Sequence, residues 1–159
     1  MRHATVLALV FLSAVASAGP YTVGTTVGRF AVEDQHGTPV HIDENVRVML
    51  LTRDMDGGNL VKTAFANVEQ KSLDAARAVY LADISGMPAL VSRLIAVPRM
   101  RQRAYRVLLD RDGSVTRNFA PAEGKVTLVA FDRLRITRIA HLATADEVRA
   151  AILPGPGPD

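Results

Sequence analysis

The spacing of apolar residues along the chain predicts a domain of mixed strands and helices. Apolar and polar residues alternate over 30–32 and again over 40–42, on either side of a turn-forming segment at 34–37, which is typical of a β-hairpin. Two nearly continuous apolar runs, 46–51 and 78–82, are typical of strands buried on both faces of a parallel sheet.

Helical spacing follows each of the two buried runs and returns near the end of the chain. From Asn59 onward the apolar positions fall on one helical face: Leu60, Val61, Ala64, Phe65 and Val68. A second helix is predicted after Pro88, ending at Pro98, with a buried stripe of Met87, Leu90, Val91, Leu94 and Ile95. A third begins at a predicted capping box of Thr144 and Glu147.

The remaining apolar segments predict the later strands of the sheet. A third buried strand is expected at 105–109, with a turn at 110–113 and a returning strand at 115–119. A final strand pair is expected at 126–131 and 136–139. Strand–helix–strand units require parallel pairing through right-handed crossovers, and the later strands add antiparallel neighbours. We therefore predict an α/β fold with a central mixed β-sheet and helices on both faces.

Residues 1–18 are typical of a cleavable export signal. A basic Arg2 precedes an apolar run over 4–15, and Ala16-Ser17-Ala18 fits the small-x-small cleavage rule. The run is too short to span a bilayer as a helix. An uncleaved anchor or a buried helix is the alternative interpretation. We expect cleavage after Ala18, a periplasmic or secreted location, and no stable membrane insertion of the cleaved chain.

Length and charge then limit the organisation and the class of partner. Removing residues 1–18 from the 159 leaves 141, enough for one domain with a core. We expect a flexible lead-in at 19–27, a domain at 28–153 and a disordered Pro/Gly tail at 154–159. Without Arg2 the chain has 18 basic and 16 acidic residues, a net charge of +2. That balance indicates no nucleic-acid partner.

The order of these segments resembles the thioredoxin-like superfamily, particularly its peroxiredoxin branch. The resemblance covers about residues 28–152 and rests on the 30–37 hairpin, the 46–52 strand, the Val107-Leu-Leu-Asp-Arg-Asp-Gly-Ser-Val115 turn and the 126–132 strand. It implies a thioredoxin-like three-layer sandwich. The segments at 54–58 and 83–88 are also similar to those of a family of exported bacterial proteins.

The chain departs from this superfamily at both of the residues that mark its active site. The family's reactive cysteine lies just after the first buried strand, where this chain has 53–58, and the whole sequence contains no cysteine. The family's cis-proline precedes the late strand, where this chain has Gly124-Lys125. The resemblance therefore carries over no peroxidase or thiol oxidoreductase activity. No Gly-x-Gly-x-x-Gly follows a strand, so we expect no flavin or other cofactor.

The sharpest candidate site is the segment at the carboxyl end of the first buried strand, Arg53-Asp54-Met55-Asp56-Gly57-Gly58. Ligands of open α/β sheets bind at that edge, and the glycines would let the backbone approach a ligand. Paired carboxylates can hold a cation or act as nucleophile and acid/base. A simpler interpretation is that Asp54 and Asp56 only stabilise the start of the following helix.

The same segment also resembles the Asp-x-Asp-Gly-Thr motif of haloacid dehalogenase phosphatases. That resemblance implies Asp54 as nucleophile, Asp56 as acid/base and magnesium as cofactor. Gly58 stands where that family has threonine, and no lysine lies between Ser85 and Asp110. A metal-dependent hydrolase or phosphatase is therefore kept as the alternative function.

Two further segments add candidate residues. Asp83, Ser85, Met87 and Pro88 follow the second buried strand, so they are expected to face the first segment; Ser85 is a nucleophile or a helix cap. The arginines at 93, 99, 101, 103 and 106 would meet anionic headgroups, phosphate or an acidic protein, or form a solvated face. The histidines show no metal-ligand spacing. The favoured hypothesis is a non-enzymatic module that binds an envelope protein or a small ligand.

Overall fold

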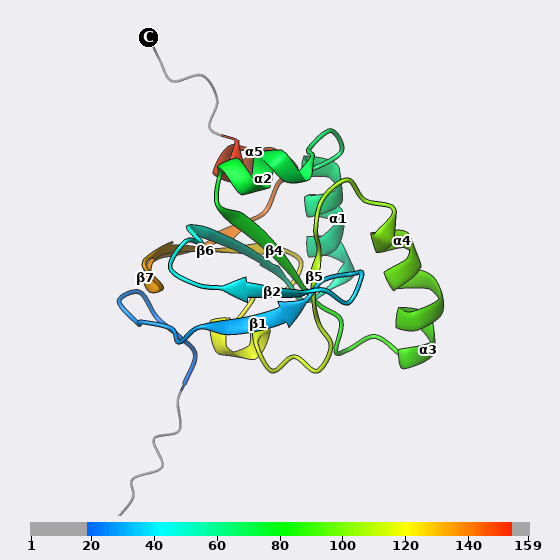
Figure 1. The fold of residues 1–159 in the computed structure, drawn as a ribbon, viewed down its shortest axis with the longest axis horizontal. Helices are drawn as coiled ribbons and strands as arrows, with labels where there is room; N and C mark the ends of the chain where they lie inside the picture. Colours follow the sequence, from blue (N-terminus) through cyan, green and yellow to red (C-terminus); the bar gives the residue numbers. More distant parts are fainter. Residues whose placement is uncertain (1–18, 154–159) are drawn as a thin grey trace, which may run out of the picture.

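A five-stranded mixed sheet stands at the centre of the molecule (Figure 1). The structure is a computed structural model, and it describes residues 19–153. The strands lie in the order β5-β4-β3-β6-β7. Their bounds are β3 (Val48–Thr52), β4 (Ala78–Asp83), β5 (Leu108–Asp110), β6 (Val126–Asp132) and β7 (Arg135–Leu142). The predicted export signal and the predicted tail lie outside the described residues.

The pairing within the sheet confirms the predicted mixture of parallel and antiparallel strands. β4 pairs in parallel with both β3 and β5, whereas β6 pairs antiparallel with β3 and with β7. Leu50 of β3 lies opposite Tyr80 of β4 and Leu128 of β6. The carboxyl ends of the three parallel strands therefore meet at one edge of the sheet.

Separate layers cover the two faces of the sheet, because side chains alternate along each strand. Leu50 and Tyr80 belong to a core cluster shared with four α-helices, α1 (Met55–Ala64), α2 (Gln70–Ala75), α4 (Val97–Arg101) and α5 (Ala145–Ile152). Met49 and Leu51 belong to a second cluster, covered by the hairpin β1 (Phe30–Glu33) and β2 (Pro39–Ile42) and by the 3₁₀ helix η2 (Thr116–Phe119). The predicted three-layer α/β sandwich is confirmed, with a 3₁₀ helix as the only helix on the hairpin side among residues 19–153.

The predicted hairpin is confirmed, and its turn carries a buried anchor. Gln35 is only 2% exposed. Its side-chain amide donates to the carbonyl of Tyr105 at 3.0 Å, and its side-chain oxygen accepts from the amide of Val107 at 2.8 Å. These bonds correct the third predicted strand: because residues 105–107 pair with a glutamine side chain, β5 begins only at Leu108.

The predicted helix after Pro88 forms, but two of its predicted features are wrong. It runs from Ala89 to Arg101 as α3 (Ala89–Val91), the π-helical segment η1 (Ser92–Ala96) and α4. Pro98 lies inside it rather than ending it. A proline ring clashes with the carbonyl four residues earlier, and the wider π turn ahead of Pro98 relieves that clash. We call this element the 89–101 helix.

The predicted buried stripe of the 89–101 helix is also wrong. Val97 is its buried apolar anchor, and Met87 is half-buried. The exposed fractions of the other four are 65% for Leu90, 41% for Val91, 59% for Leu94 and 46% for Ile95. The helix stands away from the sheet at its first turns, so its apolar face is left open rather than packed.

Three further elements, η2, α1 and α2, also differ from the predicted ones. The predicted returning strand at 115–119 is the 3₁₀ helix η2, because Asp110 accepts from the amides of Val115 and Thr116 and turns the chain there. The first helix begins at Met55 rather than Asn59, and α2 was not predicted. The capping box of Thr144 and Glu147 is confirmed. No helix among residues 19–153 has the length and hydropathy needed to cross a membrane.

Candidate functional site

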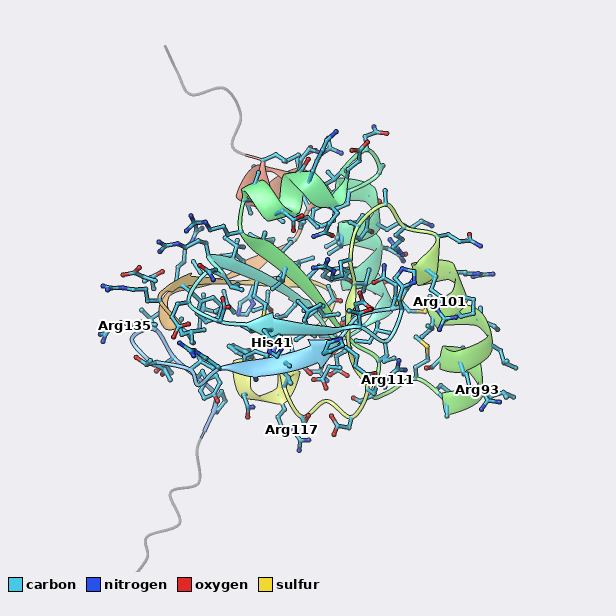
Figure 2. All side chains as sticks on the ribbon, viewed as in Figure 1. His41, Arg93, Arg101, Arg111, Arg117 and Arg135 are labelled. Carbon is cyan, nitrogen blue, oxygen red and sulfur yellow. The ribbon has the colours of Figure 1, made fainter. Side chains whose placement is uncertain are left out.

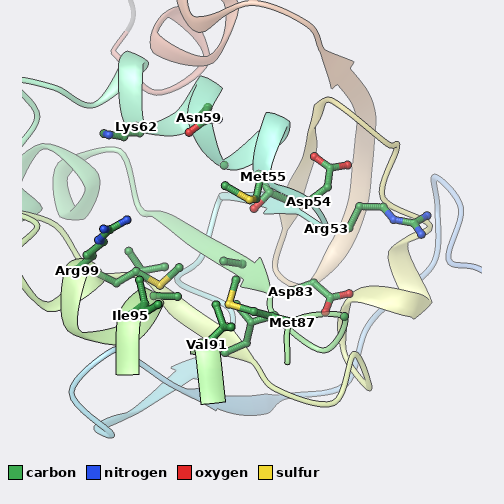
Figure 3. A pocket seen from close by; sticks show the side chains of 18 of the residues that line it. Arg53, Asp54, Met55, Asn59, Lys62, Asp83, Met87, Val91, Ile95 and Arg99 are labelled. Carbon is green, nitrogen blue, oxygen red and sulfur yellow. The ribbon is translucent and has the colours of Figure 1, made fainter. Parts of the chain in front are cut away.

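A cleft of about 640 Å³ opens at the carboxyl edge of the parallel strands, between α1 and the 89–101 helix. Figure 3 shows its two walls: Met55, Asn59 and Lys62 follow one another along α1, and Met87, Val91, Ile95 and Arg99 follow one another opposite. Tyr80 and Ala82 of β4, with Thr52 of β3, line its base. Side chains of this type, mostly apolar with a few polar groups, are the usual lining of small-molecule sites.

The cleft gathers most of the site residues that the sequence predicts. Seven of the ten line it, namely Arg53, Asp54, Met55, Gly58, Asp83, Met87 and Pro88. The other three, Asp56, Gly57 and Ser85, do not line it. The two predicted segments do face each other across the sheet edge, as their positions after neighbouring parallel strands require.

The carboxylate of Asp54 is occupied by backbone hydrogen bonds. Its Oδ1 accepts from the Gly57 amide at 2.8 Å, which caps the start of α1. Its Oδ2 accepts from the Gly124 amide at 2.7 Å, in the loop that precedes β6. Asp56 is exposed on the first turn of α1, where a negative charge favours the positive end of the helix dipole. This geometry favours a structural role for both carboxylates over a nucleophile and acid/base pair.

Gly57 packs directly against the same loop. A Cβ atom at this position would lie 2.5 Å from the backbone carbonyl oxygen of Lys125. At Gly58, by contrast, the nearest atom to such a Cβ would be the Tyr80 hydroxyl oxygen at 3.9 Å. The first glycine therefore serves close packing of α1 on the 124–125 loop, and the second keeps the cleft open beside Tyr80.

The second predicted segment is held by a carboxylate network. Asp83 Oδ1 accepts from the Ser85 amide at 2.9 Å, and its Oδ2 lies 2.8 Å from the Thr116 hydroxyl oxygen. The same hydroxyl lies 2.8 Å from Oδ2 of the buried Asp110. Ser85 contributes its backbone amide to this turn, and no histidine forms a hydrogen bond with its hydroxyl among residues 19–153. The arrangement supports a turn-stabilising role for this segment rather than nucleophilic chemistry.

The base of the cleft contains two buried hydroxyls that are hydrogen-bonded to each other. The Tyr80 hydroxyl oxygen lies 2.9 Å from that of Thr52. Burial raises the pKa of Tyr80 to about 12. The phenol is therefore a neutral group at any physiological pH, and it offers a ligand a hydrogen bond but no charge.

The arginines of 93–106 do not act as one surface. Arg101 donates to the carbonyl of Gln35 at 2.9 Å, and Arg106 Nε lies 3.7 Å from Oδ2 of the buried Asp34. Arg103 donates to the Tyr105 hydroxyl, with its guanidinium carbon 5.6 Å from the centre of that ring. Arg99 and Arg103 both line the cleft, whereas Arg93 lies on the outer side of the helix (Figure 2). The sequence could not separate these roles because they depend on which way each helical position faces.

Several residues of the site were not predicted from the sequence, among them two polar residues that line the cleft and one residue that supports it. Lys62 and Tyr80 line the cleft, and Gln35 fastens the loop that follows the 89–101 helix. For Lys62 a signal existed: Met55, Asn59 and Lys62 have the i, i+4, i+7 spacing of one helical face. For Gln35 none existed, because a glutamine in a hairpin turn has the pattern of an exposed residue.

Metal-ligating groups do not gather anywhere in the described part of the chain. No group of three His, Asp or Glu side chains in residues 19–153 has the geometry to hold a metal ion. His141 Nδ1 instead lies 3.1 Å from the Thr127 hydroxyl oxygen, and His36 is exposed at the hairpin turn.

Comparison with known proteins finds likeness at the level of the fold. No family model and no curated protein sequence matches the chain. Among solved structures it is similar to a peroxidoxin, BcpB, from Mycobacterium tuberculosis, at 22% identity and a TM-score of 0.52, over 82% of this chain and 95% of that one.

Two further solved structures carry names of thiol enzymes. A putative thiol:disulfide interchange protein, DsbE, from Chlorobium tepidum is 13% identical with a TM-score of 0.55, over 83% of this chain and 96% of that one. A putative protein disulfide isomerase from Bacteroides thetaiotaomicron is 12% identical with a TM-score of 0.55, over 82% and 90%. At these identities the likeness concerns the fold alone. The chain has the thioredoxin-like fold and contains no cysteine.

Proposed function

We propose that this protein is an exported thioredoxin-like binding module that performs no thiol redox chemistry and holds a ligand in the cleft between α1 and the 89–101 helix. One observation carries the proposal: three of the six exposed large apolar side chains among the described residues, Met55, Val91 and Ile95, line this cleft. Exposed apolar surface gathered in one place is typical of a binding site. The resemblance to peroxiredoxins puts their reactive cysteine in the segment 53–58, beside the same cleft.

The absence of thiols excludes the chemistry associated with this fold. Thiol–disulfide exchange and thiol peroxidase turnover both begin with attack by a thiolate, and this chain has no cysteine to supply one. We expect the purified protein neither to reduce insulin disulfides nor to turn over peroxide with a thiol reductant. Catalytic turnover of either substrate by preparations free of contaminating enzyme would contradict the proposal.

Binding in the cleft is tested with a neutral apolar dye, N-phenyl-1-naphthylamine, followed by its fluorescence. Ile95 lines the cleft and is 46% exposed, so Ile95→Gln should leave folding intact. We expect it to weaken dye binding about fivefold, which corresponds to about 1 kcal/mol of lost apolar contact. Leu94→Gln is the matched control, because Leu94 is the neighbouring residue, is 59% exposed and does not line the cleft. Equal effects of the two substitutions would place the dye elsewhere.

Export is the remaining part of the proposal, supported by the signal-like pattern of residues 1–18. Fractionation of cells that express the full chain, with sequencing of the amino terminus, tests it. We expect a periplasmic or secreted species that begins at Gly19. A membrane-bound species that retains Met1 would contradict export. The proposed binding in the cleft would still be tested independently by the dye experiment.

A further inference from the structure

The cleft has one cationic end. Figure 3 shows Lys62 of α1 and Arg99 of the 89–101 helix at the same end, on opposite walls, with the apolar side chains of Met55, Val91 and Ile95 between them and the sheet edge. Asp54 and Asp83 lie at the other end. The cleft is therefore polarised along its length: Lys62 and Arg99 stand at one end, Arg53, Asp54 and Asp83 at the other, and apolar side chains lie between them.

The cations at that end are available to a ligand. Among residues 19–153, neither Lys62 nor Arg99 has a carboxylate within 4.0 Å, whereas Arg29, Arg47 and Lys71 each form an ion pair. Asp54 directs both of its oxygens to backbone amides, and Asp83 directs its oxygens to the Ser85 amide and the Thr116 hydroxyl. The acids of the cleft are thus engaged within the protein, and the positive charge at the Lys62 end is not balanced there.

The apolar part of the cleft suits a flexible chain. Three of the five methionines of the sequence, Met55, Met87 and Met100, line it. Methionine side chains are unbranched and polarisable, so they adapt to apolar ligands of irregular shape. Because methionines lie on both walls of the cleft, their flexible side chains can pack against alkyl tails of different conformations.

An extended peptide fits this cleft less well than an alkyl chain does. The strand at its base, β4, is already paired on both sides, with β3 and β5, so it offers no free edge to a peptide backbone. Much of each wall is helix, and backbone groups in the interior of a helix are bonded to one another. Peptide amides buried here would lack partners, at a cost of several kcal/mol for each group. An alkyl chain carries no such groups.

We propose that the ligand of this cleft is a single-chain amphiphilic acid, with its carboxylate or phosphate head between Lys62 and Arg99 and its alkyl tail along Met55, Val91 and Ile95. The inference rests on the proposed binding function and names the ligand class. Paired cations on facing walls would each contribute a charge-assisted hydrogen bond to the head group. The tail gains affinity from each methylene that it buries.

The experiment is displacement of N-phenyl-1-naphthylamine from the purified protein by four twelve-carbon compounds, each used below its micelle concentration. The compounds are dodecanoate, dodecyl phosphate, dodecanol and dodecyltrimethylammonium. We expect both anions to displace the dye at concentrations at least tenfold lower than the cation, with the alcohol between them. Hexanoate should be at least tenfold weaker than dodecanoate. Equal displacement by anion and cation, or no effect of tail length, would overturn the inference.

Two charge-matched double variants locate the head group. Lys62→Gln with Arg99→Gln should reduce the preference for anion over cation to less than threefold while changing the affinity for the neutral dye less than twofold. Lys71→Gln with Arg93→Gln removes the same charge from residues that do not line the cleft, and it should leave the preference unchanged. If both double variants lower the preference for anions equally, that preference comes from the net charge of the protein, and the assignment of the head group to Lys62 and Arg99 is overturned.

Two other outcomes would assign the cleft to another partner class. Displacement by an apolar peptide at concentrations below those of dodecanoate would replace the amphiphile with a peptide. Co-sedimentation with phosphatidylglycerol vesicles, without displacement of the dye by monomeric dodecanoate, would assign the cationic end to a membrane surface. In every case the binding of the dye, and its weakening in Ile95→Gln, tests the proposed binding function. The displacement experiments test the class of ligand separately.

Discussion

Asp54 joins the start of α1 to the loop before β6 by accepting a hydrogen bond from the amide of Gly124 at 2.7 Å. Its other oxygen accepts from the Gly57 amide at 2.8 Å. The resemblance to peroxiredoxins puts a reactive cysteine in the segment that contains Asp54, and a cis-proline at Gly124-Lys125. In this chain the Asp54 carboxylate therefore links the two segments that correspond, by this resemblance, to the reactive cysteine and the cis-proline of peroxiredoxins.

Asp54→Asn should destabilise the protein by about 1–3 kcal/mol, measured by urea unfolding. An asparagine side chain presents one oxygen and one NH₂ group, so only one of the two backbone amides keeps its acceptor. The expected loss combines a helix cap and a hydrogen bond to a charged group. Asp56→Asn is the control, since Asp56 is exposed and lies only in the field of the helix dipole; we expect less than about 1 kcal/mol. If Asp54→Asn leaves the free energy of unfolding unchanged, the hydrogen bond to Gly124 is not required for stability.

Gly57 and Gly58 form a second matched pair within α1. Alanine favours a helix over glycine by about 1 kcal/mol. Gly58→Ala should therefore stabilise the protein by up to that amount, because its Cβ would lie 3.9 Å from the Tyr80 hydroxyl oxygen, an ordinary van der Waals distance. Gly57→Ala should destabilise it, since its Cβ would lie 2.5 Å from the Lys125 carbonyl oxygen. Thermal or urea unfolding of both variants measures the sign of each change in stability. If both substitutions stabilise the protein, the 124–125 loop can move to accommodate a Cβ at position 57.

Local patterns predicted β3, β4 and the β1–β2 hairpin correctly because these elements depend on local signals. The runs at 46–51 and 78–82 are apolar on both faces, and the observed strands β3 and β4 are buried on both faces of the sheet. The hairpin and the capping box of α5 also carry their signals within a few residues. These features could be read from the sequence without knowledge of what packs on them.

The 89–101 helix shows where local patterns stop being sufficient. Its apolar spacing predicts a helix correctly, but spacing cannot say whether an apolar face meets the core or a cleft. Leu94 and Ile95 are exposed because the helix is anchored at Val97 and held beyond its end by Gln35, a residue more than 60 positions earlier. Both the cleft and the candidate site depend on that distant contact. For Asp54 the sequence left a binding role and a helix cap open, and the hydrogen bond from the Gly57 amide agrees with the cap.

Gln35→Leu should destabilise the protein by about 1–3 kcal/mol and weaken dye binding in the cleft. The leucine would leave the Val107 amide and the Tyr105 carbonyl without their buried partner. Because these bonds position the segment that follows Arg101, the wall that carries Ile95 and Arg99 should lose its fixed place. Urea unfolding and dye titration measure the two effects. His36→Ala is the control, since His36 is the exposed neighbour; a Gln35→Leu variant that behaves like it would contradict this role.

Tyr80 should make the stability of the protein fall between pH 10 and pH 12. Burial raises its pKa from 10.0 to about 12, so the neutral phenol is favoured in the folded state. Below pH 10 the phenol is neutral in both states and its full contribution to stability is present. As pH rises toward 12 the unfolded chain ionises first, and about 2–3 kcal/mol is lost. Burial also raises the pKa of Tyr105, which adds to the fall in the same direction.

Urea unfolding of the wild type and of Tyr80→Phe at pH 8, 10, 11 and 12 tests this assignment. At pH 8 we expect Tyr80→Phe to be less stable by about 1 kcal/mol, because the Thr52 hydroxyl loses its buried partner. Between pH 10 and pH 12 the variant should lose less stability than the wild type, so the two curves should cross at about pH 11 and leave the variant the more stable protein at pH 12. The part of the fall that remains in the variant includes the contribution of Tyr105. Parallel curves across that range would mean that Tyr80 ionises alike in the folded and unfolded chains, and that the base of the cleft is open to water.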